Sequence, residues 1–146
     1  MNENKLIIPC PSCDALNPIE QGGDLKGSHC SSCTSPLFDG RPLHLTTERF
    51  NAQAQAEGLP LVIDFWAEWC GPCQTMAPIF ERLAAEFEPL LRFAKVNTDQ
   101  ETALAQYFRI SSIPTLSVIR DRHEIARIAG LLSTADLRRW LYGALS

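Results

Sequence analysis

The residues of this chain that could carry chemistry are six cysteines, all in Cys-x-x-Cys pairs: Cys10 and Cys13, Cys30 and Cys33, Cys70 and Cys73. In a reducing compartment such pairs indicate metal ligation or redox chemistry more readily than structural disulfides. No apolar run is long enough to cross a bilayer, and residues 1–9 lack the apolar core of a secretory signal. We therefore expect a cytoplasmic protein with no membrane partner.

The pair formed by Cys70 and Cys73 follows a nearly continuous apolar run at residues 61–66, which is typical of a buried strand, and precedes apolar residues at helical spacing. A thiol at a helix N-terminus has a lowered pKa, and a second thiol three residues on is close enough to form a disulfide. We expect Cys70 to attack a substrate disulfide and Cys73 to resolve the mixed disulfide. A structural pair, or a further half-site for metal, is the alternative.

The other two pairs have the spacing of a zinc ribbon, C-x2-C-x16-C-x2-C. Residues 1–40 hold few large apolar side chains, so burial alone cannot offset an ordering entropy of roughly 1–2 kcal/mol per residue. One structural Zn²⁺ with a closed four-thiolate shell would supply the missing stability. Iron or disulfides are the alternatives, and His29 is expected to stay outside the shell. The predicted ligands are Cys10, Cys13, Cys30 and Cys33.

The remaining sequence predicts alternating helices and strands. Besides the strand at 61–66, we expect strands over 92–97, 115–120 and 124–129. Helices are expected over 47–57, from residue 70 with a kink at Pro78, and over 100–108 with Thr98 or Asp99 as the cap. A last helix should begin at a capping box formed by Ser133 and Asp136. The last two strands would pair as an antiparallel hairpin. This order predicts an α/β fold with a central mixed sheet flanked by helices, at residues 44–146, after a small ribbon domain at residues 1–43.

The charge balance argues against a nucleic-acid partner. The formal net charge is −4, with three basic against five acidic residues in 1–43 and ten against twelve in 44–146. Neither part has the basic excess of a nucleic-acid-binding domain.

Residues 44–146 resemble the thioredoxin family. The resemblance rests on Asp-Phe-Trp-Ala-Glu-Trp-Cys-Gly-Pro-Cys at 64–73, Ala-Pro at 77–78, Lys-Val-Asn-Thr-Asp at 95–99, Ile-Pro-Thr at 113–115 and Gly130. An N-terminal zinc ribbon resembles the second, zinc-containing type of bacterial thioredoxin. The sequence departs from the family in two places: Gln74 stands where many relatives carry Lys or Arg, and the hairpin turn at Asp121 and Arg122 has no glycine. If either turn residue needs a positive φ, Asp is the more tolerable.

The resemblance implies several roles. Asp64 would relay a proton to or from Cys73, with Lys95 as its electrostatic partner, and Pro114 would be a cis proline facing the dithiol. Without the resemblance, Asp64 is either buried with a raised pKa or solvated at a strand end, and Pro114 is an ordinary trans proline. The surface that docks substrates would comprise Trp69, Gly71, Pro72, Ile113 and Gly130.

The function that these features predict is a protein-disulfide reductase without a tightly bound organic cofactor. By resemblance, its partners are disulfide-containing proteins and an NADPH-dependent thioredoxin reductase. An oxidant or isomerase is the closest rival, but such relatives usually carry a histidine between the cysteines, where this chain has Gly71 and Pro72. A binding module with a thioredoxin-like scaffold is a second alternative. The ribbon could also act as a redox sensor that loses zinc on oxidation.

Overall fold

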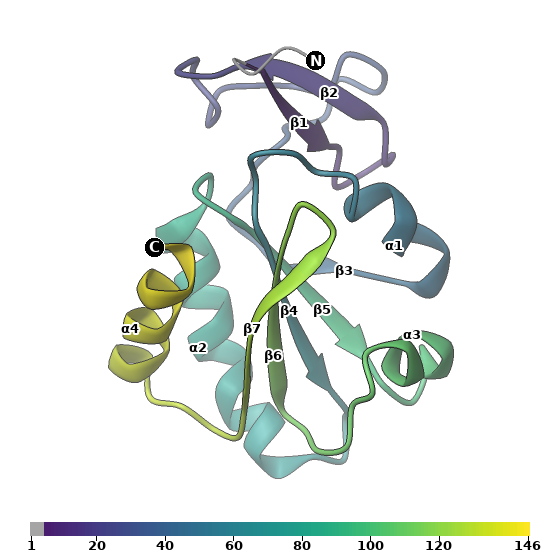
Figure 1. Cartoon of the computed structure of the whole chain (residues 1–146), viewed down its shortest axis with the longest axis vertical. Coiled ribbons are helices and arrows are strands. Elements are labelled where there is room, and N and C mark those ends of the chain that lie inside the picture. The colour runs from purple at the N-terminus through teal and green to yellow at the C-terminus, as the bar shows by residue number, and fades with distance from the viewer. Residues whose placement is uncertain (1–4) are drawn as a thin grey trace.

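A computed structural model describes residues 5–146, which form a small N-terminal ribbon above a larger α/β unit (Figure 1). The ribbon contains an antiparallel hairpin of β1 (Lys5–Pro9) and β2 (Leu16–Glu20), followed by loops that carry the second cysteine pair. Residues 1–4 of the predicted ribbon domain lie outside the described residues. No helix in the described part of the chain is long and apolar enough to cross a membrane.

The larger unit is built on a five-stranded mixed sheet in the order β3-β5-β4-β6-β7. Strands β3 and β4 both pair parallel to β5, whereas β6 is antiparallel to β4 and to β7. Strands β4, β5 and β6 are buried over nearly their whole length, as expected for central strands covered on both faces. The bounds are β3 (Leu43–His44), β4 (Leu61–Trp66), β5 (Arg92–Asn97), β6 (Thr115–Arg120) and β7 (His123–Ala129).

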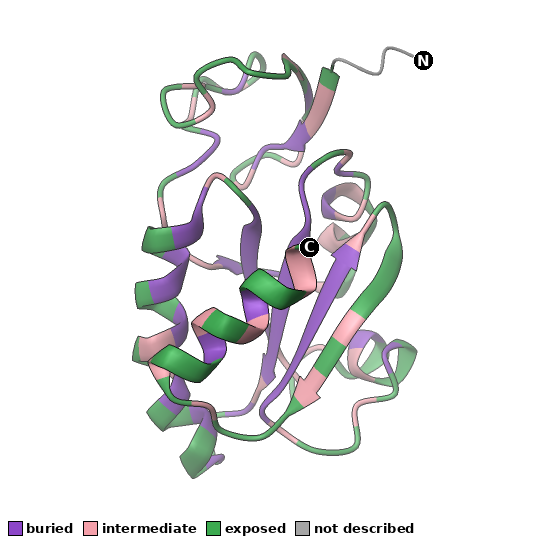
Figure 2. Ribbon diagram, turned by 60° about the vertical axis from the view of Figure 1, so that its left-hand side comes forward, coloured by how far each residue is buried: buried purple, intermediate pink, exposed green. Residues whose placement is uncertain are grey.

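Helices cover both faces of this sheet and divide its core in two. One cluster joins α2 (Gly71–Phe87) and α4 (Thr134–Leu145) to the sheet through residues such as Phe80, Phe93 and Leu137. The other joins α1 (Thr47–Gln53) and α3 (Thr102–Tyr107) to the opposite face, with Phe65 at its centre. Figure 2 shows the buried residues concentrated in the central strands and on the inward sides of the helices. The α/β fold class is confirmed.

Two predicted helices were placed wrongly at their ends. Helix α1 begins after Thr46, whose side chain accepts the Arg49 N–H, and it ends at Gln53 because the following chain turns to bond with the ribbon. Glu57 exchanges two backbone hydrogen bonds with Ile7 of β1, so it cannot belong to the predicted helix.

Helix α3 begins at Thr102 instead of residue 100, and neither Thr98 nor Asp99 caps it. The Asn97 side chain accepts the N–H groups of Asp99 and Gln100, which holds this segment in a turn.

The predicted cap of the last helix is confirmed, because the Ser133 side chain accepts the N–H of Asp136 at the start of α4. Pro78 lies inside α2, which runs as one helix from Gly71 to Phe87. Strand β3 was not predicted; its two residues pair with Ala94 and Lys95 of β5. This short strand straddles the predicted boundary between residues 43 and 44, because Leu43 already belongs to the larger sheet.

Candidate active site and metal centre

The dithiol lies where β4 gives way to α2. Cys70 is the N-cap of α2, and its sulfur accepts the backbone N–H of Cys73 at 3.2 Å. The two cysteines are joined as a disulfide with their Cα atoms 5.2 Å apart, and both residues are almost fully buried. The Cys70 sulfur also lies 3.8 Å from the carbonyl oxygen of Ile113. A thiolate formed at Cys70 on reduction would therefore sit at the positive end of the α2 dipole.

Other predicted site residues surround this disulfide. The side chain of Trp69 is mostly exposed and donates from Nε1 to Asp99 at 2.9 Å. The Ile113–Pro114 peptide bond is cis, and the Pro114 carbonyl accepts the N–H of Gly130 at 2.9 Å. The dithiol thus has an exposed indole and a cis-proline loop beside it.

A shallow cavity of about 290 Å³ opens next to these residues, lined in part by Trp69, Ile110 and Ile113. A side-chain carbon added at Gly71 would meet no atom within 4 Å, so the surface above the first helical turn is open. The site can therefore admit an extended polypeptide beside the disulfide.

Asp64 is buried in the middle of β4, which excludes the solvated strand end as its position. Burial raises the pKa of its carboxyl to about 7, while the charge of Lys95 acts in the opposite direction. Asp64 and Lys95 face each other across β4 and β5, yet neither carboxylate oxygen has a hydrogen-bond partner among the described residues. The Lys95 ammonium instead lies 4.7 Å from the centre of the Trp66 ring. A buried carboxyl with a pKa of about 7 can exchange protons near neutral pH.

The remaining four cysteines come together in the ribbon. All four sulfurs lie within 4.8 Å of one another, and the distances from Cys10 to Cys33 and from Cys13 to Cys30 are both 3.6 Å. Sulfurs at the corners of a tetrahedron with Zn–S bonds of 2.3 Å would be about 3.8 Å apart, whereas a disulfide needs about 2.05 Å. The arrangement fits a four-thiolate metal site and does not fit two disulfides.

Backbone N–H groups support the sulfurs of each turn. The Cys10 sulfur accepts N–H groups of Ser12 and Cys13, and the Cys30 sulfur accepts the N–H of Ser32. The Asn17 amide donates to Cys30 as well, at 3.5 Å. Such donors favour the thiolate form that metal ligation requires.

The contacts that attach the ribbon to the larger unit were not foreseen from the sequence. Asp14 takes a positive φ of 66° just after the first cysteine pair, and both of its carboxylate oxygens accept from the guanidinium of Arg49 on α1. Gln53, one helical turn later, donates to Asp14 at 2.7 Å and to the Cys10 carbonyl at 2.9 Å. The only sequence feature that pointed to this contact was the four-residue spacing of Arg49 and Gln53, which puts both side chains on one face of the helix.

A second attachment point is buried beneath the ribbon. Arg92, at the start of β5, donates to the backbone carbonyls of Leu37 at 2.8 Å and Pro9 at 3.1 Å. Its guanidinium also stacks 4.6 Å from the Phe38 ring and lies 3.9 Å from the Glu88 carboxylate. Burial raises the pKa of Glu88 to about 7, against the opposing effect of Arg92. The only sign of this contact in the sequence was the charged Arg92 at the start of the strand predicted over 92–97.

Comparison with known proteins agrees with this geometry. The thioredoxin family model matches residues 41–142. The chain belongs to the thioredoxin family. It is 38% identical over 136 residues to thioredoxin C-3 of Corynebacterium nephridii, covering 93% of both chains. A mutant thioredoxin from Halobacterium salinarum superposes with a TM-score of 0.66 at 25% identity, over 75% of this chain and 95% of the other.

A fused relative also matches this thioredoxin. The bifunctional thioredoxin reductase/thioredoxin of Mycobacterium leprae is 32% identical over 129 residues, which span 86% of this chain and 28% of that protein. With Cys70 and Cys73 at the junction of β4 and α2, this member of the thioredoxin family is a thiol–disulfide oxidoreductase.

Proposed function

We propose that this protein reduces disulfides in other proteins through Cys70 and Cys73. The observation that carries the proposal is the position of Cys70 as the N-cap of α2, with its sulfur accepting the N–H of Cys73. The same N–H and the helix dipole would stabilise a thiolate at Cys70, which is the nucleophilic form of the thiol. Cys73 lies in the first turn of α2 beside Cys70, and its sulfur is the group available to resolve a mixed disulfide.

The reaction has two exchange steps. The Cys70 thiolate attacks one substrate sulfur, the substrate S–S bond breaks, and the departing thiolate takes a proton from solvent. Cys73 then loses its proton and attacks Cys70, so that the Cys70–Cys73 disulfide forms and the second substrate thiolate leaves. Two electrons pass from the dithiol to the substrate.

Asp64 is the group we propose to accept the proton of Cys73. Its carboxyl is buried in β4, directly before the site, and its pKa of about 7 matches proton transfer at neutral pH. Lys95, opposite it on β5, would limit how far that pKa rises. The carboxyl lacks a hydrogen-bond partner among the described residues, which leaves it free to act on an approaching thiol.

Substrates would dock as extended segments along the loop of Ile113 and Pro114. The exposed ring of Trp69 and the open surface at Gly71 and Pro72 would contact the segment on one side, and Gly130 on the other. Reduced protein would be regenerated by a thioredoxin reductase using NADPH. The fused relative from Mycobacterium leprae, a bifunctional thioredoxin reductase/thioredoxin, supports this choice of partner. Such a cycle belongs in the cytoplasm, where thiols are kept reduced.

The ribbon would hold one structural Zn²⁺ through Cys10, Cys13, Cys30 and Cys33. Bound there, the ion would complete its shell with four thiolates and leave no position for water, so it would stabilise the fold without entering the exchange steps. The domain division that we propose is a ribbon at residues 1–43 and a catalytic domain at residues 44–146, although β3 of the larger sheet begins one residue before this boundary, at Leu43. Oxidation of the ligands would release the ion, which is the basis for a redox-sensitive role.

The test is reductase-coupled reduction of insulin by three proteins: wild type, Cys70→Ser and Cys33→Ser. We expect Cys70→Ser to abolish turnover and Cys33→Ser, a matched thiol substitution in the ribbon, to retain it. A Cys73→Ser variant should accumulate mixed disulfides at Cys70, identified by mass spectrometry. Trapping at neither cysteine, or full turnover by Cys70→Ser, would contradict the proposal.

A further inference from the structure

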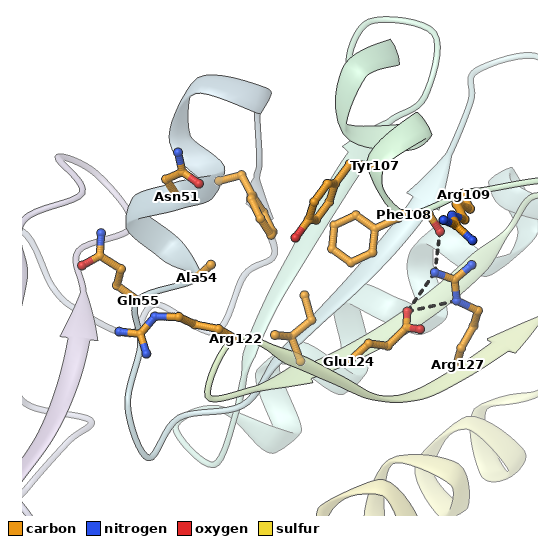
Figure 3. Close-up of a pocket in the computed structure, with 11 residues that line it drawn as sticks. Asn51, Ala54, Gln55, Tyr107, Phe108, Arg109, Arg122, Glu124 and Arg127 are labelled. Atoms are coloured by element: carbon orange, nitrogen blue, oxygen red, sulfur yellow. Dashed lines mark hydrogen bonds and ion pairs between the residues drawn. The ribbon is translucent and has the colours of Figure 1, made fainter.

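A cavity of about 680 Å³ opens between α1, the end of α3 and the β6–β7 hairpin (Figure 3). Its size is within the range of pockets that hold small ligands. Phe50, Tyr107, Phe108 and Ile119 form its apolar part, and none of the residues proposed for thiol exchange lines it. Tyr107 is 72% exposed, so one face of its ring is available for stacking. The cavity is therefore separate from the dithiol and has an aromatic wall.

More basic than acidic side chains line this cavity. Arg109, Arg122 and Arg127 stand against a single acid, Glu124. Arg127 is already engaged, because it pairs with Glu124 at 2.9 Å and donates to the Phe108 carbonyl at 2.6 Å. The guanidinium groups of Arg109 and Arg122 have no hydrogen-bond or ion-pair partner among residues 5–146. Two unneutralised cations in one cavity are notable in a chain of net charge −4.

The backbone at Arg109 favours glycine over arginine. Its φ is 54°, and it directly follows Phe108, the C-cap residue of α3. The N–H of Arg109 bonds to the Gln106 carbonyl. The N–H of Ile110 bonds to the Ala105 carbonyl, which completes the hydrogen bonds of a Schellman motif. The residue at this position of the motif is usually glycine, because a side chain strains the left-handed conformation.

The backbone at Arg122 has the same preference. Asp121 and Arg122 are the two loop residues between the paired Arg120 and His123, and their φ values are 50° and 69°. Two positive φ values define a type I′ turn, whose second loop residue is preferably glycine. The sequence had marked this turn for its missing glycine, and Arg122 is the residue that stands in its place. Both free arginines of the cavity thus occupy positions where their side chains oppose the backbone conformation.

We propose that this cavity binds a small ligand that combines a flat aromatic ring with an anionic group such as phosphate. The ring would lie against Tyr107 and Phe50, and the anionic group would bind Arg122. Figure 3 shows the Arg122 side chain running beneath α1 toward Gln55, whose amide would donate to the same group. Arg109 lies at the opposite end, beyond Phe108, and would act through its charge at longer range. A binding role explains arginines where the fold prefers glycine.

The probe for this site is 1-naphthyl phosphate, titrated into ¹⁵N-labelled full-length protein while amide chemical shifts are followed. We expect saturable shifts at Ala54, Tyr107 and Arg122. Arg122→Gly should weaken binding about tenfold or more, since it removes a charge-assisted contact. Arg109→Gly should weaken it about two- to threefold, as expected for a screened charge.

Asp121→Gly is the matched control, because it places glycine in the same turn but removes a negative charge, so binding should be kept or strengthened. Urea midpoints provide a second readout: Arg109→Gly and Arg122→Gly should unfold at or above the wild-type concentration. Insulin reduction should be unchanged in both variants. A stability loss would show that the arginines serve the turns, and would overturn the proposal.

Comparison ligands decide the chemical class. Inorganic phosphate alone and 1-naphthol alone should each bind at least tenfold more weakly than 1-naphthyl phosphate. Equal binding by either would overturn the combined aromatic and anionic requirement. Displacement of the probe by a short glutamate-rich peptide at comparable concentration would assign the cavity to an acidic protein segment instead, and shifts confined to other surfaces would also overturn the proposal.

Discussion

Replacing Asp64 with asparagine should stabilise the oxidised protein while impairing its redox activity. The carboxyl is buried in β4, and neither of its oxygens has a hydrogen-bond partner among the described residues. Asparagine has nearly the same shape and no charge, so the substitution loses no hydrogen bond present in the fold. What it removes is the free energy needed to keep a buried carboxylate ionised above neutral pH.

The magnitude follows from the pKa. The Asp64 pKa is raised from 3.8 to about 7 by burial, so the unfolded chain releases this proton at lower pH than the folded protein does. Below pH 3.8 the Asp64 carboxyl is neutral in both the folded and the unfolded state, and its contribution to the free energy of unfolding is at its maximum. That contribution is lost as the pH rises through about 7. At about 1.36 kcal/mol per pKa unit, Asp64→Asn should gain roughly 4 kcal/mol at pH 8 but only roughly 2 kcal/mol near pH 5.

The assay is urea unfolding of both proteins at pH 5 and at pH 8, with the Cys70–Cys73 disulfide intact so that the thiols do not titrate. The gain should be roughly 2–3 kcal/mol larger at pH 8. Asp121→Asn is the control, since water solvates this exposed acid in both states. Insulin reduction by Asp64→Asn should be slowed at neutral pH. An equal gain at the two pH values, or a loss of stability at pH 8, would refute the reasoning.

Three further outcomes concern the ribbon. Cys30→Ser should reduce bound zinc from about one per chain to near zero by elemental analysis, and retention of stoichiometric metal would exclude it as a ligand. A double-mutant cycle of Asp14→Ala and Arg49→Ala should give a coupling of about 1–3 kcal/mol by urea unfolding, because both side chains are only about a quarter exposed; additive losses would show that the contact is incidental. Arg92→Met should destabilise the protein by about 3–5 kcal/mol at pH 8, where Glu88 is left buried and charged. The loss should be smaller at pH 6, because the pKa of Glu88 is raised to about 7 and the carboxyl becomes neutral; the opposite pH trend would contradict this account.

The strands at the centre of the fold could be predicted because their sequence and their environment agree. The bounds of β4, β5 and β6 match the predicted strands. The clearest signal was the nearly continuous apolar run of β4, which is typical of a strand covered on both faces. The end of α1 could not be predicted, because a contact distant in sequence decides it: Glu57 bonds to β1. The start of α3 was misplaced for a local reason, because the side chain of Asn97 accepts the N–H groups of Asp99 and Gln100 and holds a turn there.

The candidate site divides in the same way. The cysteine pairs could be found from spacing alone, because a short loop brings both sulfurs of a pair together whatever the rest of the fold does. Asp64 could be suspected because a charge interrupts an apolar run. The cavity beside Tyr107 could not be predicted, since its lining comes from α1, α3 and the hairpin. The one local signal was a turn without glycine at Arg122.

The ribbon and the dithiol lie at opposite ends of the central strands. Figure 1 shows the ribbon above the starts of β4 and β5, whereas Cys70 follows the far end of β4. Two backbone carbonyls of the ribbon accept hydrogen bonds from the two terminal nitrogens of the buried Arg92 guanidinium at that near end. If the ribbon unfolded, Arg92 would lose these acceptors while remaining at the start of a buried strand, which is costly for a cation. Metal loss should therefore act on this thioredoxin through the stability of β5, and not through direct contact with the reacting sulfurs.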